Sequence, residues 1–294
     1  MMMLKRLTNY LLNKFNLDIV RKERINQIDL KNITYFRGLI YNDFYKPFIT
    51  FAYISDIRAL PSFSFNLSDI HPFVISSKLL IKEDFKNKEK TIAILREFYK
   101  IYQPSSAADI LNIQNDKLRN EPSWATLLPW EQEDLETWKT HVKNSVLNEN
   151  KRNKSNIDIE DGWAWSGPIS EIKLMVEFNR LLKVVKSISK RGYNSKYHQD
   201  DYIVTYLLVN KHNQATHLAR TGQHRLAALG ALGYDKVKVK VFKIVYQEDA
   251  KYWPNVVNGL FSLDEANKVF SKYFNNDLSS TANAWMQYCK SLDI

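Results

Sequence analysis

The stretch Thr221-Gly222-Gln223-His224-Arg225-Leu226-Ala227-Ala228-Leu229 decides the fold that this sequence predicts. The segment 215–219 before it has strand character, and the apolar run after it ends at Gly233, a residue type that commonly terminates helices. Gly222 therefore lies where a strand turns into a helix. The first amides of such a helix have no intrahelical acceptor, and the helix dipole favours an anion beside them. The sequence thus predicts a turn that binds a phosphate group.

The candidate phosphate-binding residues are Thr221, Gly222, Gln223, His224 and Arg225. Gly222 has no side chain, so a phosphate can approach the backbone closely. The side chains of His224 and Arg225 add donors to the first-turn amides, and a guanidinium can bind an oxyanion through two hydrogen bonds. Many strand-to-helix turns contain a glycine and a basic residue without binding anything, so a purely structural turn is the alternative.

A longer pattern surrounds this turn. The run Leu-Ala-Ala-Leu-Gly-Ala-Leu-Gly and a strand at 236–242 follow it, and a helix near 170–190, Ser187-Ile188, Gly192 and a strand at 203–209 precede it. Over about residues 160–245 this arrangement resembles the ParB/sulfiredoxin superfamily. In members of that superfamily a Gly-x-His-Arg or Gly-x-Arg-Arg turn contacts nucleotide phosphates. The resemblance implies an α+β fold with a mixed sheet and helices.

Three activities of the superfamily can be compared with this turn. Sulfiredoxin needs a cysteine where this chain has Gln223, which disfavours its thiol chemistry here. Partition proteins of the ParB kind have Gly-Glu-Arg-Arg and a helix-turn-helix domain after it. In this chain His224 replaces the first arginine of that pair, and residues 247–294 are predicted to be packing helices, so DNA is disfavoured as a partner. The free-serine kinases have Asp-Gly-His-His-Arg. This chain keeps the glycine, the second histidine and the arginine, but has Thr221 and Gln223 at the other two positions.

The closest motif therefore implies a kinase-like phosphotransferase. The donor is ATP or another nucleotide, Mg²⁺ is expected with it, and the acceptor is a hydroxyl of a small molecule, a glycan or a lipid-linked compound. The resemblance makes Glu171, near the start of the helix at 170–190, the catalytic base, with His224 as the second catalytic residue. Alternatively, Glu171 is an acidic residue in the first turn of the helix that interacts favourably with the helix dipole and has no catalytic role. The alternative functions are a ParB-like nucleic-acid-binding protein or nuclease, and a non-catalytic module that senses a nucleotide.

Composition is consistent with anionic partners. The chain has 294 residues, a formal net charge of +10, 45% hydrophobic residues and 25% charged residues. A basic protein favours nucleotides, nucleic acids, phosphosugars or an anionic membrane surface. Its single cysteine, Cys289, suits the reducing cytoplasm and excludes an internal disulfide. His198, Asp200 and Asp201 resemble metal ligands by composition only, so no metal site is predicted.

Residues 3–16 place leucines and Phe15 at helical spacing between basic and polar residues. This amphipathic basic helix either docks onto the protein body or lies on an anionic membrane. A peripheral contact with the inner face of the membrane is therefore part of the predicted location.

Three regions are predicted along the chain: an α+β region at 1–155, the superfamily-like domain at 156–246 and a helical extension at 247–294. A polar, asparagine-rich linker at 143–154 separates the first two. Asp56, Arg58 and His71 are interpreted as solvated loop residues, with a second substrate site as the alternative. Trp124 and Trp130 are interpreted as core residues, with stacking on a sugar or a base as the alternative. The elements expected outside the central domain are strands at 33–40, 48–54 and 73–75, and helices at 88–102, 131–147, 263–273 and from about 280.

Overall fold

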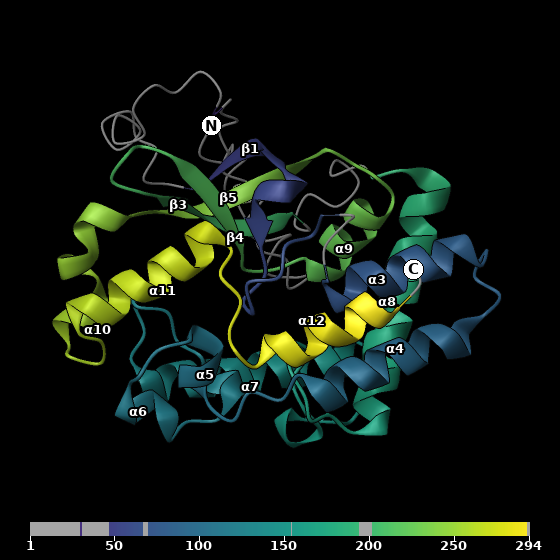
Figure 1. Ribbon diagram of the computed structural model, residues 1–294, viewed down its shortest axis with the longest axis horizontal. Coiled ribbons are helices and arrows are strands. Elements are labelled where there is room, and N and C mark those ends of the chain that lie inside the picture. The colour runs from purple at the N-terminus through teal and green to yellow at the C-terminus, as the bar shows by residue number, and fades with distance from the viewer. Residues whose placement is uncertain (1–29, 31–46, 67–69, 154, 194–201, 293–294) are drawn as a thin grey trace, which may run out of the picture.

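Alternating and β-branched apolar runs form a five-stranded mixed sheet in the computed structural model, which describes residues 30, 47–66, 70–153, 155–193 and 202–292 (Figure 1). Its strands are β1 (Phe48–Tyr53), β2 (Ile57–Arg58), β3 (Ile203–Val209), β4 (Ala215–Ala219) and β5 (Lys236–Tyr246). In β5 the valines are buried and the lysines are half-exposed up to Val241, as their alternation predicts. The expected helix at 3–16, the expected strand at 33–40, and His198, Asp200 and Asp201 lie outside the described residues.

The strand order is β1-β5-β3-β4-β2. The central strand β3 pairs in parallel with β5 and antiparallel with β4, whereas the edge strands β1 and β2 pair antiparallel with β5 and in parallel with β4. β1 and β2 precede residue 155 in the chain, and their partners follow it. The sheet is therefore built from both sides of the predicted boundary at 155.

Helices surround this sheet, so the predicted α+β class is confirmed. Figure 1 shows α11 alongside the sheet, with α4 and α12 on the side away from β1. The helices are α3 (Pro72–Lys82), α4 (Lys88–Ile101), α5 (Ala107–Leu111), α6 (Asp116–Arg119), α7 (Leu135–Arg152), α8 (Glu171–Arg191), α9 (Gln223–Ala231), α10 (Pro254–Val257), α11 (Leu263–Asn275) and α12 (Ala282–Ser291). Short 3₁₀ helices occur at η2 (Ile54–Asp56), η3 (Ser123–Ala125), η4 (Ile159–Asp161) and η5 (Gln247–Tyr252).

Local capping explains where several helices begin. The Ser170 hydroxyl accepts a hydrogen bond from the amide of Lys173 at 3.1 Å and so starts α8, as predicted. Ser262 and Glu265 form a capping box at the start of α11. His71 caps α3 by accepting from the amide of Phe73, and Pro72 occupies the first helical position.

Three predictions in the first half of the chain are wrong. The segment 73–75 is helical, because the cap at His71 starts α3 there. Neither His71 nor Arg58 is a solvated loop residue, since His71 is only 2% exposed and Arg58 is a half-buried residue of β2. The expected linker at 143–154 is the continuation of α7 as far as Arg152, where Val146 and Asn150 are buried. Tertiary burial thus overrides the polar local composition.

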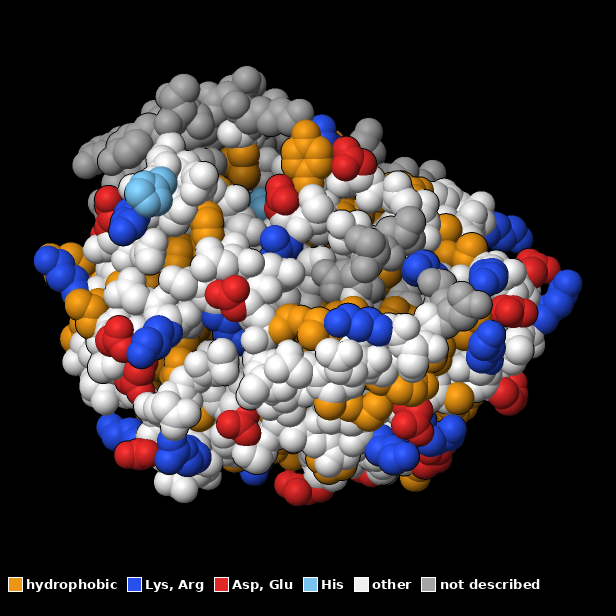
Figure 2. Space-filling model, in the orientation of Figure 1, with side chains coloured by type: hydrophobic (Ala, Val, Ile, Leu, Met, Phe, Trp, Pro, Cys, Tyr) orange, Lys and Arg blue, Asp and Glu red, His pale blue; other side chains and the backbone are white. Residues whose placement is uncertain are grey.

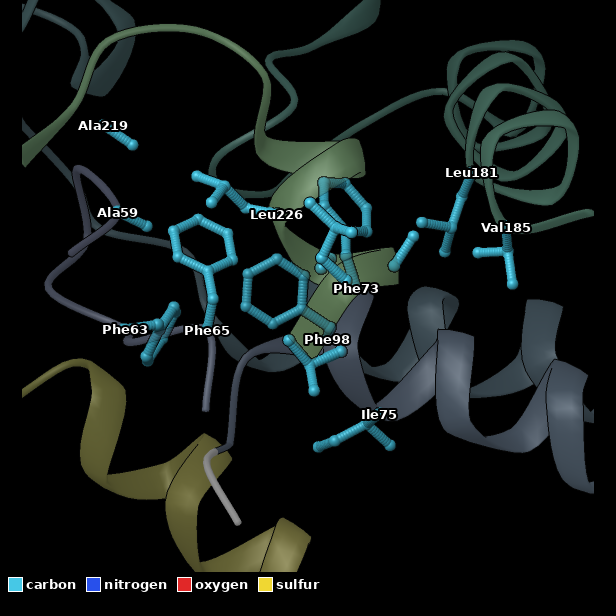
Figure 3. Packing of buried hydrophobic residues seen from close by; sticks show 14 of the residues in the cluster. Ala59, Phe63, Phe65, Phe73, Ile75, Phe98, Leu181, Val185, Ala219 and Leu226 are labelled. Atoms are coloured by element: carbon cyan, nitrogen blue, oxygen red, sulfur yellow. The ribbon is translucent and has the colours of Figure 1, made fainter. Parts of the chain in front are cut away.

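The two faces of the sheet contribute to different hydrophobic clusters. Ile203, Val237 and Val239 belong to a cluster shared with α3, α4, α8, α9 and α12, and Tyr206 and Val245 belong to one shared with α5 and α11. Figure 3 shows Phe73 of α3, Leu181 and Val185 of α8 and Leu226 of α9 within the first cluster. Trp130 is fully buried, as expected of a core residue.

Helix α9 packs closely against the segment that precedes α3. A Cβ at Gly230 would lie 1.9 Å from the carbonyl oxygen of Phe65, so only glycine allows this approach. This packing fixes α9 on the sheet, with its first turn at the end of β4. Among the described helices, none is long and apolar enough to cross a membrane.

Candidate functional site

The first turn of α9 has the geometry expected of an anion-binding turn. Gly222, the residue before the helix, adopts a left-handed conformation with φ of 87°, and no side chain caps the helix. A Cβ at this position would lie 2.9 Å from Cγ1 of Ile203. Gly222 is therefore required both by its backbone conformation and by the close approach of β3.

The five candidate phosphate-binding residues differ in exposure. Thr221 is exposed, Gly222 and Arg225 are partly exposed, and Gln223 and His224 are each 8% exposed. The amides of Gln223 and His224 have no hydrogen-bond acceptor among the residues that the structure describes. The turn is thus open at Thr221, Gly222 and Arg225, while the side chains of Gln223 and His224 are largely buried.

The imidazole of His224 lies between an aromatic ring and a carboxylate. Its ring stacks on that of Phe73, with centroids 4.6 Å apart and planes at 24°. Its Nε2 lies 3.0 Å from Oε2 of Glu177, on α8. This separation is within hydrogen-bond range, although the atoms are not aligned as a hydrogen bond. The ring is therefore held by packing on one side and by a charge on another.

Glu177 is the centre of a group of titratable side chains, which we call the charged cluster: Lys173, Glu177, Arg180, Glu149 and His224. Lys173 and Glu177 are fully buried, whereas the Glu149 side chain is 41% exposed. The fully buried carboxylate of Glu177 lies 2.7 Å from Nζ of Lys173 and accepts two hydrogen bonds of 3.0 Å from Nη1 of Arg180. Arg180 also donates to Glu149, and Lys173 donates to Oδ1 of Asn150 at 3.0 Å. Buried charges need such partners, because moving a charged group out of water without a partner is costly.

Burial and pairing act in opposite directions on these groups. Burial by itself raises the pKa of Glu177, but contacts with His224, Arg180 and Lys173 outweigh it and hold this pKa well below its usual range. Burial lowers the pKa of His224, and the carboxylate of Glu177 only partly opposes that shift. The expected state near neutral pH is therefore an ionised Glu177 beside a neutral imidazole.

His71 also faces this region. Burial, and then the proximity of the titratable His224 ring, lower the pKa of His71 to about 3. Its Nδ1 accepts from the amide of Phe73 at 3.2 Å, whereas its Nε2 has no partner among the described residues. His71 therefore adds an uncharged ring behind His224 and Phe73.

Glu171, the predicted catalytic base, occupies a different place. It lies in the first turn of α8, its side chain is 61% exposed, and its Oε1 lies 2.6 Å from Nη2 of Arg96. Glu171 and Glu177 are six residues apart, so on an α-helix they project from different faces. The carboxylate that the structure brings to His224 is Glu177.

The sequence interpretation missed the charged cluster, although part of its signal was present. Lys173, Glu177 and Arg180 follow i, i+4, i+7 spacing, which places three charges on one face of α8. On this helix Ile172 is 61% exposed, while Leu174, Phe178 and Leu181 are buried. Charged residues on a face flanked by buried leucines indicate a buried polar network.

Among the described residues, no group of three or more His, Cys, Asp or Glu side chains is placed to hold a metal ion. Comparisons with protein-family models, with curated proteins and with solved structures return no match to this chain. The site's chemistry is therefore argued from its own residues.

Proposed function

We propose that this protein is a nucleotide-binding phosphotransferase with a ParB/sulfiredoxin-like domain, and that it holds nucleotide phosphates at residues 221–225. The observation that supports it best is the uncapped start of α9 at Gly222. The amides of Gln223 and His224 have no described acceptor there, and Gly222 and Arg225 are reachable from solvent. Free amides, a helix dipole and a guanidinium together make a binding site for a phosphate group.

The chemical demands of phosphoryl transfer fit such a site. The reaction depends on positioning and on stabilising charge more than on covalent help from the protein. Mg²⁺ is expected with the nucleotide, held mainly by phosphate oxygens and neutralising their charge, as is usual for this ion. The superfamily resemblance implies that the proton of the acceptor hydroxyl passes to one of two candidates: Glu171, on the exposed first turn of α8, or His224, at the turn itself. The acceptor is a small molecule, a glycan or a lipid-linked compound.

Thermal stability with nucleotides tests this proposal. We expect ATP, ADP or CTP with Mg²⁺ to raise the melting temperature, because a ligand that binds only the folded state stabilises it. Arg225→Ala should weaken that shift, whereas the control Lys183→Ala, an exposed cation on α8, should keep it. If no nucleotide stabilises the wild type, and Arg225→Ala behaves like wild type, the proposal is wrong.

A second candidate function is nucleic-acid binding, which four exposed cations on α8 favour: Lys183, Lys186, Lys190 and Arg191. On the face shown in Figure 2, however, basic and acidic side chains are interspersed and form no continuous basic patch. Retention on DNA that falls steeply with salt would support this function. Nucleotide binding without turnover would instead identify a sensing module.

A further inference from the structure

The position of Glu177 has a consequence for which nitrogen of His224 carries a proton. Glu177 Oε2 lies 3.0 Å from Nε2, and the ring is stacked on Phe73, so rotation of the imidazole is restricted. An ionised carboxylate can only accept hydrogen bonds, so it favours a proton on the nitrogen that faces it. In a neutral imidazole one nitrogen carries the proton and the other is an acceptor.

The surrounding charges favour the neutral ring. From α8, Lys173 and Arg180 already pair with Glu177, and from α7 Glu149 pairs with Arg180. From the start of α3, the fully buried His71 faces the ring as well. The positive charges of Lys173 and Arg180 balance the negative charges of Glu177 and Glu149. A proton added to His224 would therefore leave a net positive charge in this largely buried cluster.

Resting on the proposed function, we propose that Glu177 is a positioning residue that holds His224 as the Nε2-protonated tautomer. His224, through Nδ1, is then the catalytic residue that removes the proton from the acceptor hydroxyl. Glu177 is itself a poor base, because three positively charged or hydrogen-bonding groups already surround its carboxylate. This assigns proton removal to the buried pair and not to the exposed Glu171.

The step balances as a single phosphoryl transfer. The oxygen of the acceptor hydroxyl forms a bond to the terminal phosphorus of the nucleoside triphosphate, and its proton passes to Nδ1 of His224. The bond from that phosphorus to the bridging oxygen breaks, and the nucleoside diphosphate leaves with the electron pair. His224 later releases the proton to water, and the charge of Glu177 stabilises the imidazolium in between.

Nitrogen NMR of the histidine rings tests the tautomer without any substrate. The chain has six histidines, and His224→Gln identifies the His224 signal by its loss. In the wild type we expect a proton on Nε2 and none on Nδ1 from pH 6 to pH 8. Glu177→Gln should allow both tautomers, whereas the control Glu160→Gln, an exposed carboxylate in η4, should change nothing. A proton on Nδ1, or a cationic ring at pH 7, would overturn the proposal even if Glu177→Gln fails to fold.

Turnover of Mg²⁺–ATP, with water as the acceptor, provides the second measurement. We expect His224→Gln to lower kcat about 100-fold or more with little change in KM for ATP, the usual size of a general-base effect. Glu177→Gln should lower kcat about 10-fold or more and shift the pH profile, as loss of the carboxylate that orients a general-base histidine does. An unchanged rate and pH profile in folded Glu177→Gln would overturn the proposal. If no nucleotide stabilises the wild type, the proposed function fails, while the tautomer measurement still decides the role of Glu177 in orienting His224.

Discussion

Two lysines of this protein are almost fully buried, and they have opposite surroundings. Lys173 on α8 is 1% exposed and lies 2.7 Å from the carboxylate of Glu177. Lys272 on α11 is 3% exposed, and its ammonium group donates to the hydroxyl of Ser62 and lies 4.5 Å from the centre of the Tyr273 ring. One amine has a carboxylate within ion-pair distance, and the other has a hydroxyl and a π face.

This difference decides what each site can do. A buried cation beside a carboxylate is stabilised by a full opposite charge, so the cluster around Lys173 can hold its charges in a fixed arrangement. Burial lowers the pKa of Lys272 to about 7, and Asp277 raises it only in part. The first region is suited to orienting His224, while the second gains or loses a proton near neutral pH. Burial alone therefore does not mark a functional charge, and the partner does.

The largest expected loss of stability comes from removing the central carboxylate of the charged cluster, that of Glu177. Glu177→Leu leaves the ammonium of Lys173 and the guanidinium of Arg180 with fewer anionic partners in a buried site. Breaking such a pair costs about 3–5 kcal/mol, which urea denaturation can measure. The double variant Glu177→Leu/Lys173→Met should recover part of this loss, because it also removes one buried cation. A cost of the single variant below about 1 kcal/mol would show that the cluster is not held as the structure describes.

The second prediction concerns Lys272, which should make the free energy of unfolding depend on pH. Its pKa is about 7 in the folded protein and about 10.4 in an unfolded chain. Between these values the unfolded state binds more protons, so stability should rise with pH, by up to about 1.4 kcal/mol per unit above pH 7. Urea denaturation at pH 7, 8 and 9 measures this rise.

Two variants serve as references for that measurement. Lys272→Met should remove the pH-dependent rise, because its side chain does not titrate. Lys268→Met, an exposed position on the same helix, should keep it. If wild type and Lys272→Met show the same dependence on pH, the amine of Lys272 is protonated in the folded protein across this range.

Much of the fold around these two regions could be predicted from the sequence. The strands at 203–209 and 215–219 have the predicted bounds, and α8 and α11 begin within one residue of their predicted starts, each after a capping serine. These features are local, since periodicity and capping depend on neighbouring residues. The start of α3 was also encoded locally by Pro72, although short apolar runs are ambiguous between strand and helix.

The candidate site was only partly predictable for the same reason. The turn at Gly222 follows from the local order of strand, glycine and helix. The contact between Glu177 and His224 joins α8 to α9 through tertiary packing, and no local pattern fixes it. Asn150 illustrates this further, because its polar surroundings indicated a linker whereas its amide is buried beside Lys173. What the sequence did contain was the helical spacing of the three charges on α8.

A smaller effect compares the two lysines directly. At pH 7, Lys173→Met removes a charged partner of Glu177 and the hydrogen bond to Asn150, and we expect a cost of about 2 kcal/mol. Lys272→Met removes one hydrogen bond to Ser62 but replaces a partly neutral amine with an apolar chain, so its cost should stay within about 1 kcal/mol. Urea denaturation of both variants at the same pH measures the difference. Equal costs would contradict the distinction between the two sites.

The smallest effect concerns the exposed counterpart of the buried pair on the same helix. Glu171 pairs with Arg96 at 2.6 Å, but the two side chains are 61% and 49% exposed. Glu171→Gln should therefore change the free energy of unfolding by at most about 1 kcal/mol, and less in high salt, because water and ions screen exposed charges. Urea denaturation at low and high salt checks this. Since the structural cost is small, a large loss of ATP turnover in this variant would assign the proton removal to Glu171 and contradict its assignment to His224, whereas a nearly unchanged rate would support the buried pair.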